Sequence, residues 1–559
     1  MSIIWSVFFM LGGVATMMLG MKLMGNALEQ VAGKGMKKLL GKVTTNRFAG
    51  IGVGVAVTSI IQSSTATTVM LVGFVNIGLM SLVQATNVIM GANIGTTITA
   101  HIVSLSGVSN VDIGAIASMV GFAGIMIVML LKNDRVKSVG NILVGLGMIF
   151  IGLEFISNYA TQIMFVEGNK LSPHGWVRAI FQADHFPLLL VAIGVILTAF
   201  VHSSSTITSL MVVLASVGVL TFENALFLAL GANIGTCITS ILSSAGAQVN
   251  AKRTAIVHLL FNVFGCLIFI VPLWIFKPQI ARVFASISSD VGRQIAVFHT
   301  LFNVVTTLVL LPFVNAIVKL ACLIIPEASI EEENEGYKFQ YIDNRMLQTP
   351  PIAVSYTKKE LVRMSEYART NVNLAMEMLF NNKIDNEKEI RENELIINHL
   401  NRSITEYLTK LMSKDLTNDD EKKIGSYYHV VSDIERVGDY AENILEYALK
   451  LREEDMVMSE DAKTELKEMN LAVNSLYEYS ISAFDDRNVA LLDRVNLEEE
   501  KIDGIAKELE NRHIDRVKKG LCKAQVGSVY LQTASNLERV GDHIHNIAKS
   551  IKQYNSIKS

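Results

Sequence analysis

Two polar motifs, each present twice, interrupt the apolar sequence in the first half of this chain. QSSTATTVM at 62–70 is followed by GANIGTTIT at 91–99, and the pair returns 140 residues later as HSSSTITSL at 202–210 and GANIGTCIT at 231–239. A bilayer offers no water to such side chains, so each unsatisfied polar group costs several kcal/mol. Duplicated small-residue interruptions of hydrophobic segments indicate a transporter whose substrate site lies between internal repeats.

Charge and hydropathy divide the chain into two unlike parts that meet near residue 325. Residues 1–325 contain 17 Lys and Arg against 8 Asp and Glu, whereas residues 326–559 contain 32 against 44. Most of the apolar stretches in the first part exceed the roughly 20 residues that a spanning helix needs. We therefore predict a membrane domain over 1–325 with about eight transmembrane helices, followed by a soluble domain.

The two Ser/Thr clusters lie inside unusually long apolar stretches. The stretches around 48–77 and 187–220 are long enough for more than one helix, so each predicts a helical hairpin or a broken helix rather than one straight span. The duplicated motifs therefore predict two repeats, at about 1–157 and 187–325. Basic loops near 34–47 and 132–137 belong on the cytoplasmic side, which places the N-terminus outside. Residues 1–26 lack a basic leader region, so we interpret them as a retained helix.

Ser and Thr at helix interruptions can bind both kinds of ion. Their hydroxyls coordinate hard cations, and the free N–H groups at a helix start attract anions. The second motif of each copy places an asparagine and two threonines where they can form a sodium site: Asn93, Thr96, Thr99, Asn233, Thr236 and Thr239. The alternative is that these small residues only allow close helix packing. Duplication at equal spacing makes that alternative the weaker one.

A third repeated element, HLLFN at 258–262 and HTLFN at 299–303, places His and Asn on one face of two successive helices. Ionisable residues inside membrane segments are candidates for function. Both histidines can equally be neutral partners in helix packing, and the sequence favours neither interpretation. The acids Glu154 and Asp112 lie near membrane segments, where either can sit at an interface.

The QSS(S/T) signature, the GANIGT elements and the HxxxFN helices together resemble the type II sodium/phosphate cotransporter family, in a bacterial form, over residues 1–325. The resemblance implies inverted repeats, with the QSSS segments at the tips of re-entrant hairpins and phosphate bound between them with Na⁺. The implied phosphate site consists of Gln62, Ser63, Ser64, Thr65, His202, Ser203, Ser204 and Ser205. His202 departs from the family's Gln, and an imidazole titrates near neutral pH whereas a carboxamide does not. Sodium stoichiometry, pH dependence and the coupling ion therefore stay open.

The second part of the chain begins with an acidic, Pro-containing linker at 326–351 and continues as a helical domain over 352–559. Its apolar residues recur with helical periodicity. The domain is also duplicated, since DIERVGDYAEN from 433 parallels NLERVGDHIHN from 536. Two three-helix bundles are the natural architecture, so the fold class that we predict for the whole chain is all-α.

The shared ERVGD sequence places two acids at i, i+4, where like charges destabilise a helix by a few tenths of a kcal/mol. A compensating cation would relieve this repulsion. Oxygen ligands suit hard metals such as Mg²⁺, Ca²⁺, Mn²⁺ or Fe³⁺, and the candidates are Glu394, Glu435, Asp439, Glu499, Asp503, Glu538 and Asp542, with Asn398 in place of an acid. The alternative is a solvated acidic stripe paired with Arg436 and Arg539.

This part resembles the PhoU family of phosphate-signalling regulators over residues 355–555. The resemblance implies two symmetric three-helix bundles with E/DxxxD motifs, and in some members these motifs bind multinuclear metal clusters. It therefore favours a divalent or ferric metal at the acids named above. Gly438 and Gly541 fall in mid-helix, where Gly costs about 1 kcal/mol relative to Ala, so we expect close helix or metal approach there.

Together these patterns predict a multi-pass protein of the bacterial cytoplasmic membrane that carries phosphate with Na⁺ by alternating access. Its PhoU-like domain would be cytoplasmic and regulatory. We expect no enzymatic chemistry and no nucleic-acid partner. A regulatory protein partner and a homo-oligomer are both compatible with the fused helical domain, although no heptad seam specifies a dimer. The alternatives are a phosphate exporter or carrier of a related oxyanion, and a membrane-anchored sensor that binds phosphate without transport.

Overall fold

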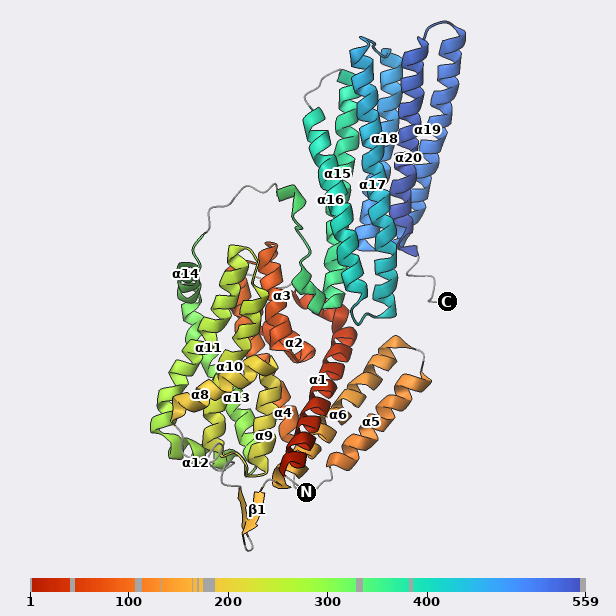
Figure 1. Cartoon of the computed structure of the whole chain (residues 1–559). Coiled ribbons are helices and arrows are strands. Elements are labelled where there is room, and N and C mark those ends of the chain that lie inside the picture. The colour runs from red at the N-terminus through yellow and green to blue at the C-terminus, as the bar shows by residue number, and fades with distance from the viewer. Residues whose placement is uncertain are drawn as a thin grey trace. The chain divides into compact units, whose positions relative to one another are not determined.

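The computed structural model describes residues 3–40, 46–105, 113–131, 133–162, 164–167, 170–173, 186–327, 335–381 and 386–552. Contacts between residues divide the chain into a membrane unit, Met1–Ser329, and a helical unit, Ile330–Ser559 (Figure 1). Both units are built from helices. A short antiparallel hairpin, β1 Met164–Glu167 with β2 Lys170–Pro173, departs from the all-α prediction. It occupies the less apolar sequence between the two repeats.

The helices of the membrane unit fall into two series separated by that hairpin. The first is α1 Ile3–Leu40, α2 Arg47–Ile61, α3 Ser64–Asn76, α4 Leu82–Ser104, α5 Ile113–Leu130 and α6 Asp134–Gln162. The second is α8 Pro187–Val201, α9 Ser204–Ser216, α10 Phe222–Ser243, α11 Val249–Ile275, α12 Lys277–Ile287, α13 Val291–Leu310, η3 Leu311–Phe313 and α14 Val314–Ile324.

Among the described residues, five helical segments are long and apolar enough to cross a membrane, namely Ile4–Ala32, Val136–Gln162, Phe222–Ser243, Val249–Ile275 and Val291–Ile324. Shorter apolar helices accompany them, including α2, α3, α8 and α9. The long apolar stretches around 48–77 and 187–220 thus each form two short helices rather than one span, because the chain breaks at the Ser/Thr clusters.

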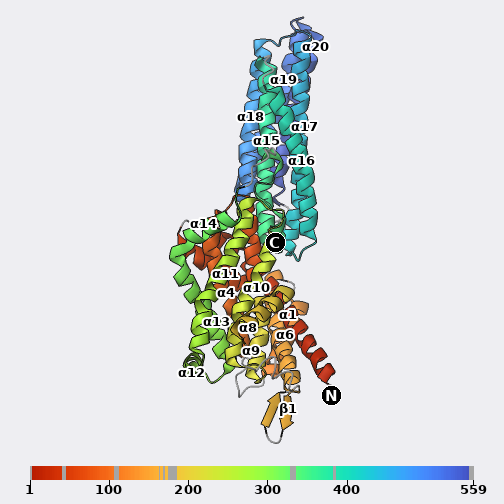
Figure 2. The ribbon, with the colours of Figure 1, turned by 60° about the vertical axis from the view of Figure 1, so that its left-hand side comes forward.

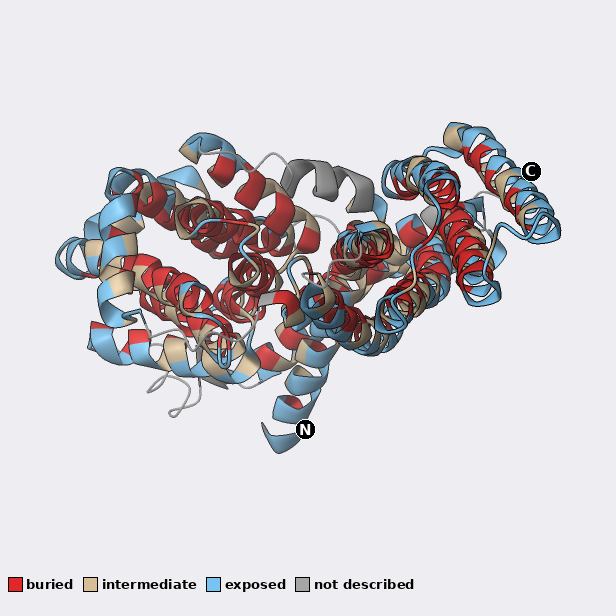
Figure 3. Cartoon of the chain, turned by 90° about the horizontal axis from the view of Figure 1, so that it is seen from above, coloured by how far each residue is buried: buried red, intermediate tan, exposed pale blue. Residues whose placement is uncertain are grey.

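Large apolar side chains cover the outer surface of the membrane unit. Phe200, Met119 and Leu323 are 86%, 73% and 79% exposed, and Figure 3 shows buried residues on the inward faces of the helices and exposed ones outside. Apolar surface on this scale marks contact with a membrane or another protein. The unit therefore has the surface expected of a protein embedded in lipid.

Glycines let the paired helices of each repeat approach closely. A Cβ added at Gly54 would overlap the carbonyl oxygen of Val88 on α4, and one at Gly194 would overlap that of Leu228 on α10. These positions are 140 residues apart, as the motifs are. The packing of α2 on α4 is therefore repeated in the packing of α8 on α10.

The helical unit contains η4 Glu335–Tyr337, η5 Asn344–Gln348, α15 Pro350–Asn381, α16 Glu387–Met412, α17 Asn418–Glu453, α18 Glu460–Asp486, η6 Val489–Leu491, α19 Leu492–Lys518 and α20 Ala524–Lys549. Helices α15, α16 and α17 pack on one another, and so do α18, α19 and α20. Contacts of α17 with α20 and of α15 with α18 join the two groups (Figure 2).

Part of the segment interpreted as a linker packs on the helical unit. Ile342 and Met346 are buried. The fully buried carboxylate of Glu360 accepts hydrogen bonds from the backbone N–H groups of Gln340, at 3.1 Å, and Tyr341, at 2.6 Å. A buried carboxylate requires such partners, so the stretch before α15 is tied to α15 rather than extended between domains.

Candidate functional site

The two Ser/Thr clusters form the same tight turn. Gln62 is the C-cap of helix α2, with φ 57° and ψ 23°, and His202 is the C-cap of α8, with φ 58° and ψ 22°. These are left-handed conformations, which cost a non-glycine residue of the order of 1–3 kcal/mol and cluster at functional sites. The following serine returns to extended geometry in both copies, at Ser63 and Ser203, and caps the next helix.

The second motif of each copy braces this turn. The Thr99 hydroxyl on α4 donates to Gln62 Oε1 at 2.8 Å, and the Thr239 hydroxyl on α10 lies 3.1 Å from His202 Nδ1. Both pairs are 37 residues apart in sequence. His202 therefore keeps the bracing hydrogen bond with a different functional group. Thr99 and Thr239, predicted as sodium ligands, contact the turns directly.

The serines at the turns present hydroxyls and backbone N–H groups at two helix starts. Ser63 Oγ accepts from the Ala66 N–H at 3.1 Å, and Ser203 Oγ accepts from the Thr206 N–H at 3.2 Å. Ser64 and Ser204 are buried, and among the described residues their hydroxyls have no hydrogen-bond partner. The first N–H groups of a helix lack intrahelical acceptors and favour an anion. Thr65 and Ser205 follow in the first turns of α3 and α9.

Thr68 and Thr208, one helical turn beyond Ser64 and Ser204, belong with this set although the sequence reasoning missed them. Both are 1% exposed, and neither hydroxyl has a hydrogen-bond partner in the described part of the chain. Buried polar atoms without partners are rare in proteins. Their i+4 spacing from the serines and their separation of 140 residues were the signals available in the sequence.

The remaining predicted sodium ligands are buried; three of them are bonded within their own helices, and Asn233 is bonded to a neighbouring helix. The Thr96 and Thr236 hydroxyls donate to the carbonyls four residues before them, each at 3.0 Å. Asn93 Nδ2 donates to Ile89 O at 3.0 Å, and Asn233 Oδ1 lies 3.2 Å from His299 Nε2. A hydroxyl that donates its proton keeps its lone pairs, so these oxygens can still face a cation.

The His and Asn residues of α11 and α13 form part of the buried contact with α10. His258 Nδ1 lies 3.1 Å from the Ser240 hydroxyl, and His299 contacts Asn233. The other ring nitrogen of each histidine is buried without a partner among the described residues. The hydrogen bonds fit the packing interpretation and the unpaired nitrogens fit the functional one, so both interpretations stay open.

Each repeat's short helix packs on the other repeat. Helix α3 contacts α10 and α11, and α9 contacts α4 and α6. The two serine turns therefore belong to one assembly, although they lie 140 residues apart. Of the acids near membrane segments, Glu154 is exposed on α6 and Asp112 lies outside the described residues.

In the helical unit, Glu394 is the buried member of an acidic cluster. Its Oε1 accepts from Asn398 Nδ2 at 3.0 Å, and its Oε2 has no partner in the described part of the chain. Burial, followed by the charges of Glu442, Asp439 and Glu435 on α17, raises the pKa of Glu394 to about 7.

The two mid-helix glycines of the helical unit have different surroundings. A Cβ at Gly438 would lie 2.8 Å from Glu394 Oε2, so the expected close approach is present there. At Gly541 the nearest atom would be Ile502 Cδ1 at 3.4 Å, an ordinary contact. Close approach is therefore present at Gly438 and absent at Gly541.

The equivalent acids of the other bundle have different partners. Glu499 Oε1 lies 2.8 Å from Nδ1 of His545, which stands where the first bundle has Glu442. Burial raises the pKa of Glu538, with smaller contributions from the charges of Asp503 and Asp542. Across the described ranges, no group of three or more His, Cys, Asp or Glu is placed to hold a metal ion. The cluster is thus not a preformed ligand set, and metal binding stays a prediction.

Comparisons with known proteins found a matching protein family for each half of the chain. A family model described as Na+/Pi-cotransporter matches residues 16–158 and 159–289, and one described as PhoU domain matches 361–448 and 466–551. The "Putative inorganic phosphate export protein YjbB" of Escherichia coli (strain K12) is 25% identical over 97% of this chain and 96% of its own length.

Two further relatives match smaller shares of the chain. The "Uncharacterized protein YqeW" of Bacillus subtilis (strain 168) is 30% identical over 55% of this chain and 94% of its own length. The "Sodium-dependent phosphate transport protein 2B" of Rattus norvegicus is 35% identical over 20% of this chain and 17% of its own length.

Proposed function

Because the chain belongs to the Na⁺/Pi-cotransporter family and carries PhoU domains, we propose that it moves inorganic phosphate across the membrane with net flux out of the cell. The relatives named for phosphate export match it over nearly its whole length. That match favours the export alternative over the uptake direction that the sequence analysis put first. The protein is a multi-pass transporter and not an enzyme.

The observation that carries the proposal is the turn built twice, at Gln62 and at His202, each just before a helix whose first turns are rich in Ser and Thr. Phosphate oxygens accept hydrogen bonds from hydroxyls and from free backbone N–H groups. We assign Ser64, Thr68, Ser204 and Thr208 as the hydroxyls that contact phosphate. Since each short helix packs on the other repeat, both turns can contribute to one site.

The finer topology belongs to the same proposal. The hairpins α2–α3 and α8–α9 enter the bilayer without crossing it, and the repeats that contain them are inverted. The bilayer is the bacterial cytoplasmic membrane, and the PhoU domains are cytoplasmic, where they regulate the flux. The packed glycines and the matched dihedral angles of the two turns support equivalent repeats.

The number of coupled Na⁺ ions sets the electrical part of the driving force. An inside-negative potential drives each negative charge outward by about 2.3 kcal/mol per 100 mV, so a phosphate dianion gains roughly 5 kcal/mol on leaving. Two Na⁺ moving with it would cancel this electrical term. Sodium-coupled uptake is therefore the second candidate function, favoured by the 35% identity to the sodium-dependent relative.

Phosphate flux in proteoliposomes tests both candidates. We expect efflux of radiolabelled phosphate from vesicles loaded at high concentration, and the effect of imposed Na⁺ gradients and potentials will give the coupling. Ser64→Ala and Ser204→Ala are each expected to lower the flux about tenfold, by loss of a hydrogen bond to a charged group worth roughly 1.5–3 kcal/mol.

Ser216→Ala is the matched control, because the Ser216 hydroxyl donates only within α9, to Val212 O at 2.9 Å. Absence of flux under every gradient, with folded protein, would overturn the transport proposal. Phosphate binding retained in that case would leave the sensor alternative.

A further inference from the structure

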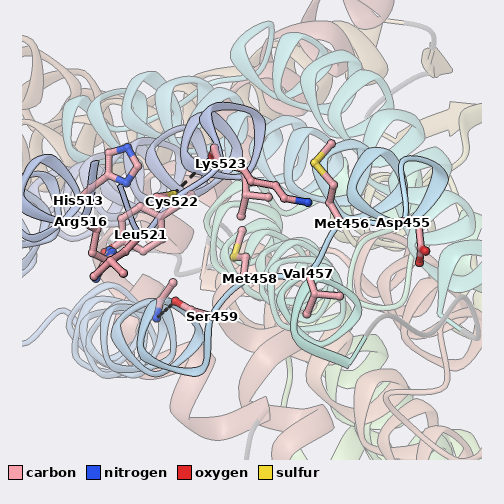
Figure 4. Close-up of a pocket in the computed structure, with 13 residues that line it drawn as sticks. Asp455, Met456, Val457, Met458, Ser459, His513, Arg516, Leu521, Cys522 and Lys523 are labelled. Carbon is pink, nitrogen blue, oxygen red and sulfur yellow. Dashed lines mark hydrogen bonds between the residues drawn. The ribbon is translucent and has the colours of Figure 1, made fainter. Parts of the chain in front are cut away.

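A cavity of about 470 Å³ lies at one end of the second bundle of the helical unit (Figure 4). It is lined by the loop between α17 and α18, the end of α19 and the start of α20. Pockets of roughly 300–1,000 Å³ hold small organic ligands. The acids of the ERVGD sequences do not line it, so it is separate from the predicted metal site.

His513 is the first sign that this cavity binds a ligand. Its side chain is 8% exposed and lines the cavity, yet among the described residues it has no hydrogen-bond partner. Its ring stacks on Tyr530, with centroids 5.6 Å apart. A buried imidazole without a partner calls for a ligand or water, and the cavity is where either would sit.

Two cationic side chains, those of Arg516 and Lys523, line the cavity. Arg516 pairs with Glu465 at 2.9 Å, but its Nη2 is buried and has no partner in the described structure. Lys523 lines the cavity at the start of α20 and makes no ion pair within the described residues. No side chain caps that helix start, so its first N–H groups are free for an anion.

The opposite wall is apolar. Met456, Val457 and Met458 line the cavity from the loop after α17, and Leu521 lines it from the turn before α20. Val457 and Leu521 are 64% and 72% exposed. Figure 4 shows Asp455, an acid of the lining, at the end away from His513. The cavity thus combines an anion-binding end with an apolar wall, and a bare phosphate ion would leave most of it empty.

We propose that this cavity binds a phosphorylated organic molecule of the nucleoside phosphate class. The phosphoryl group lies against Arg516, His513 and the start of α20, since a guanidinium and a helix N-terminus both favour phosphate. The base packs on the apolar wall. A regulatory domain with such a pocket can report a phosphorylated metabolite to the membrane unit, and the inference does not depend on the direction or the occurrence of transport.

Alkylation of Cys522 by N-ethylmaleimide in the full-length, detergent-solubilised protein tests this directly. Cys522 lines the cavity and is partly exposed, whereas Cys322, also partly exposed, lies in the membrane unit and serves as the internal control. We expect AMP or ATP to slow alkylation of Cys522 several-fold without slowing that of Cys322. Inorganic phosphate alone is expected to protect weakly.

Lys523→Ala provides the second measurement, because Lys523 is exposed and its loss leaves the bundle core intact. We expect it to raise the half-protecting AMP concentration about tenfold, with Lys518→Ala, outside the lining, as the matched control. The proposal is overturned if millimolar AMP and ATP do not protect Cys522, or if they protect Cys322 equally. It is also overturned if inorganic phosphate protects Cys522 as well as AMP does, or if protection by AMP is unchanged in Lys523→Ala. The readout is labelling rather than flux, so its failure is distinct from failure of the transport proposal.

Discussion

Glu394 is expected to make the stability of the helical unit depend on pH. Its pKa is about 7 in the fold against 4.5 for the ordinary side chain, chiefly because it is buried. The folded state therefore holds the proton more tightly than the unfolded chain. The stabilising contribution is complete below pH 4.5 and is lost as the pH rises through 7. At about 1.4 kcal/mol per unit, the loss amounts to at most about 3.5 kcal/mol.

Urea unfolding of residues 330–559 between pH 5 and pH 8 measures this loss. Glu394→Gln is the matched comparison, because Gln keeps an oxygen for Asn398 Nδ2 and cannot ionise. We expect the free energy of unfolding of the wild type to fall relative to that of the variant by 1–3 kcal/mol across this range. Parallel curves for the two proteins would refute the reasoning.

The same assay bears on the metal prediction. Bound cations would neutralise Asp439 and Glu442, whose charges contribute to the raised pKa of Glu394. Mn²⁺ or Ca²⁺ is then expected to restore stability at pH 8 in the wild type. Elemental analysis of protein purified without chelators is the direct check, and absence of metal would return these acids to the solvated-stripe interpretation.

Further substitutions address the paired turns and helices. Gly54→Ala is expected to lower stability by about 2 kcal/mol, because the added Cβ overlaps the α4 backbone. Gly52 has open space around it, so Gly52→Ala is expected to be neutral or stabilising. Thermal unfolding in detergent compares the two variants. Thr239→Val removes the brace of the second turn and is expected to lower phosphate flux about tenfold. His202→Gln retains a hydrogen-bond partner for the Thr239 hydroxyl and is expected to preserve flux. His202→Leu removes that partner and is expected to lower flux. Equal flux in the two variants would contradict the role of this hydrogen bond.

Local patterns made much of the architecture predictable. Apolar length indicated membrane helices, and the duplicated motifs indicated equivalent elements, which appear as the matched turns at Gln62 and His202. Helix period and the repeated ERVGD sequence indicated a duplicated helical domain. These signals depend on residues that are close in sequence, so they can be recognised without knowledge of the tertiary packing.

Contacts between distant residues were beyond such patterns. The segment before α15 was interpreted as a linker because it is acidic and contains Pro-Pro, yet the buried Glu360 binds its backbone. The sequence did not indicate that Glu499, a predicted metal ligand of the second bundle, contacts His545. The cavity beside His513 is built from three separate segments and has no motif. Each of these three features depends on which helices pack against one another.

The duplication in the sequence thus determined by itself that this protein has two equivalent polar turns within apolar helices. Only the tertiary structure decided what holds them. Thr99 and Thr239 brace the turns across 37 residues, and α3 and α9 pack on the opposite repeats. The physical reason is that adjacent residues govern helix capping and turn formation. A hydrogen bond between two helices, by contrast, forms only when close contacts at glycines have brought the backbones of those helices together.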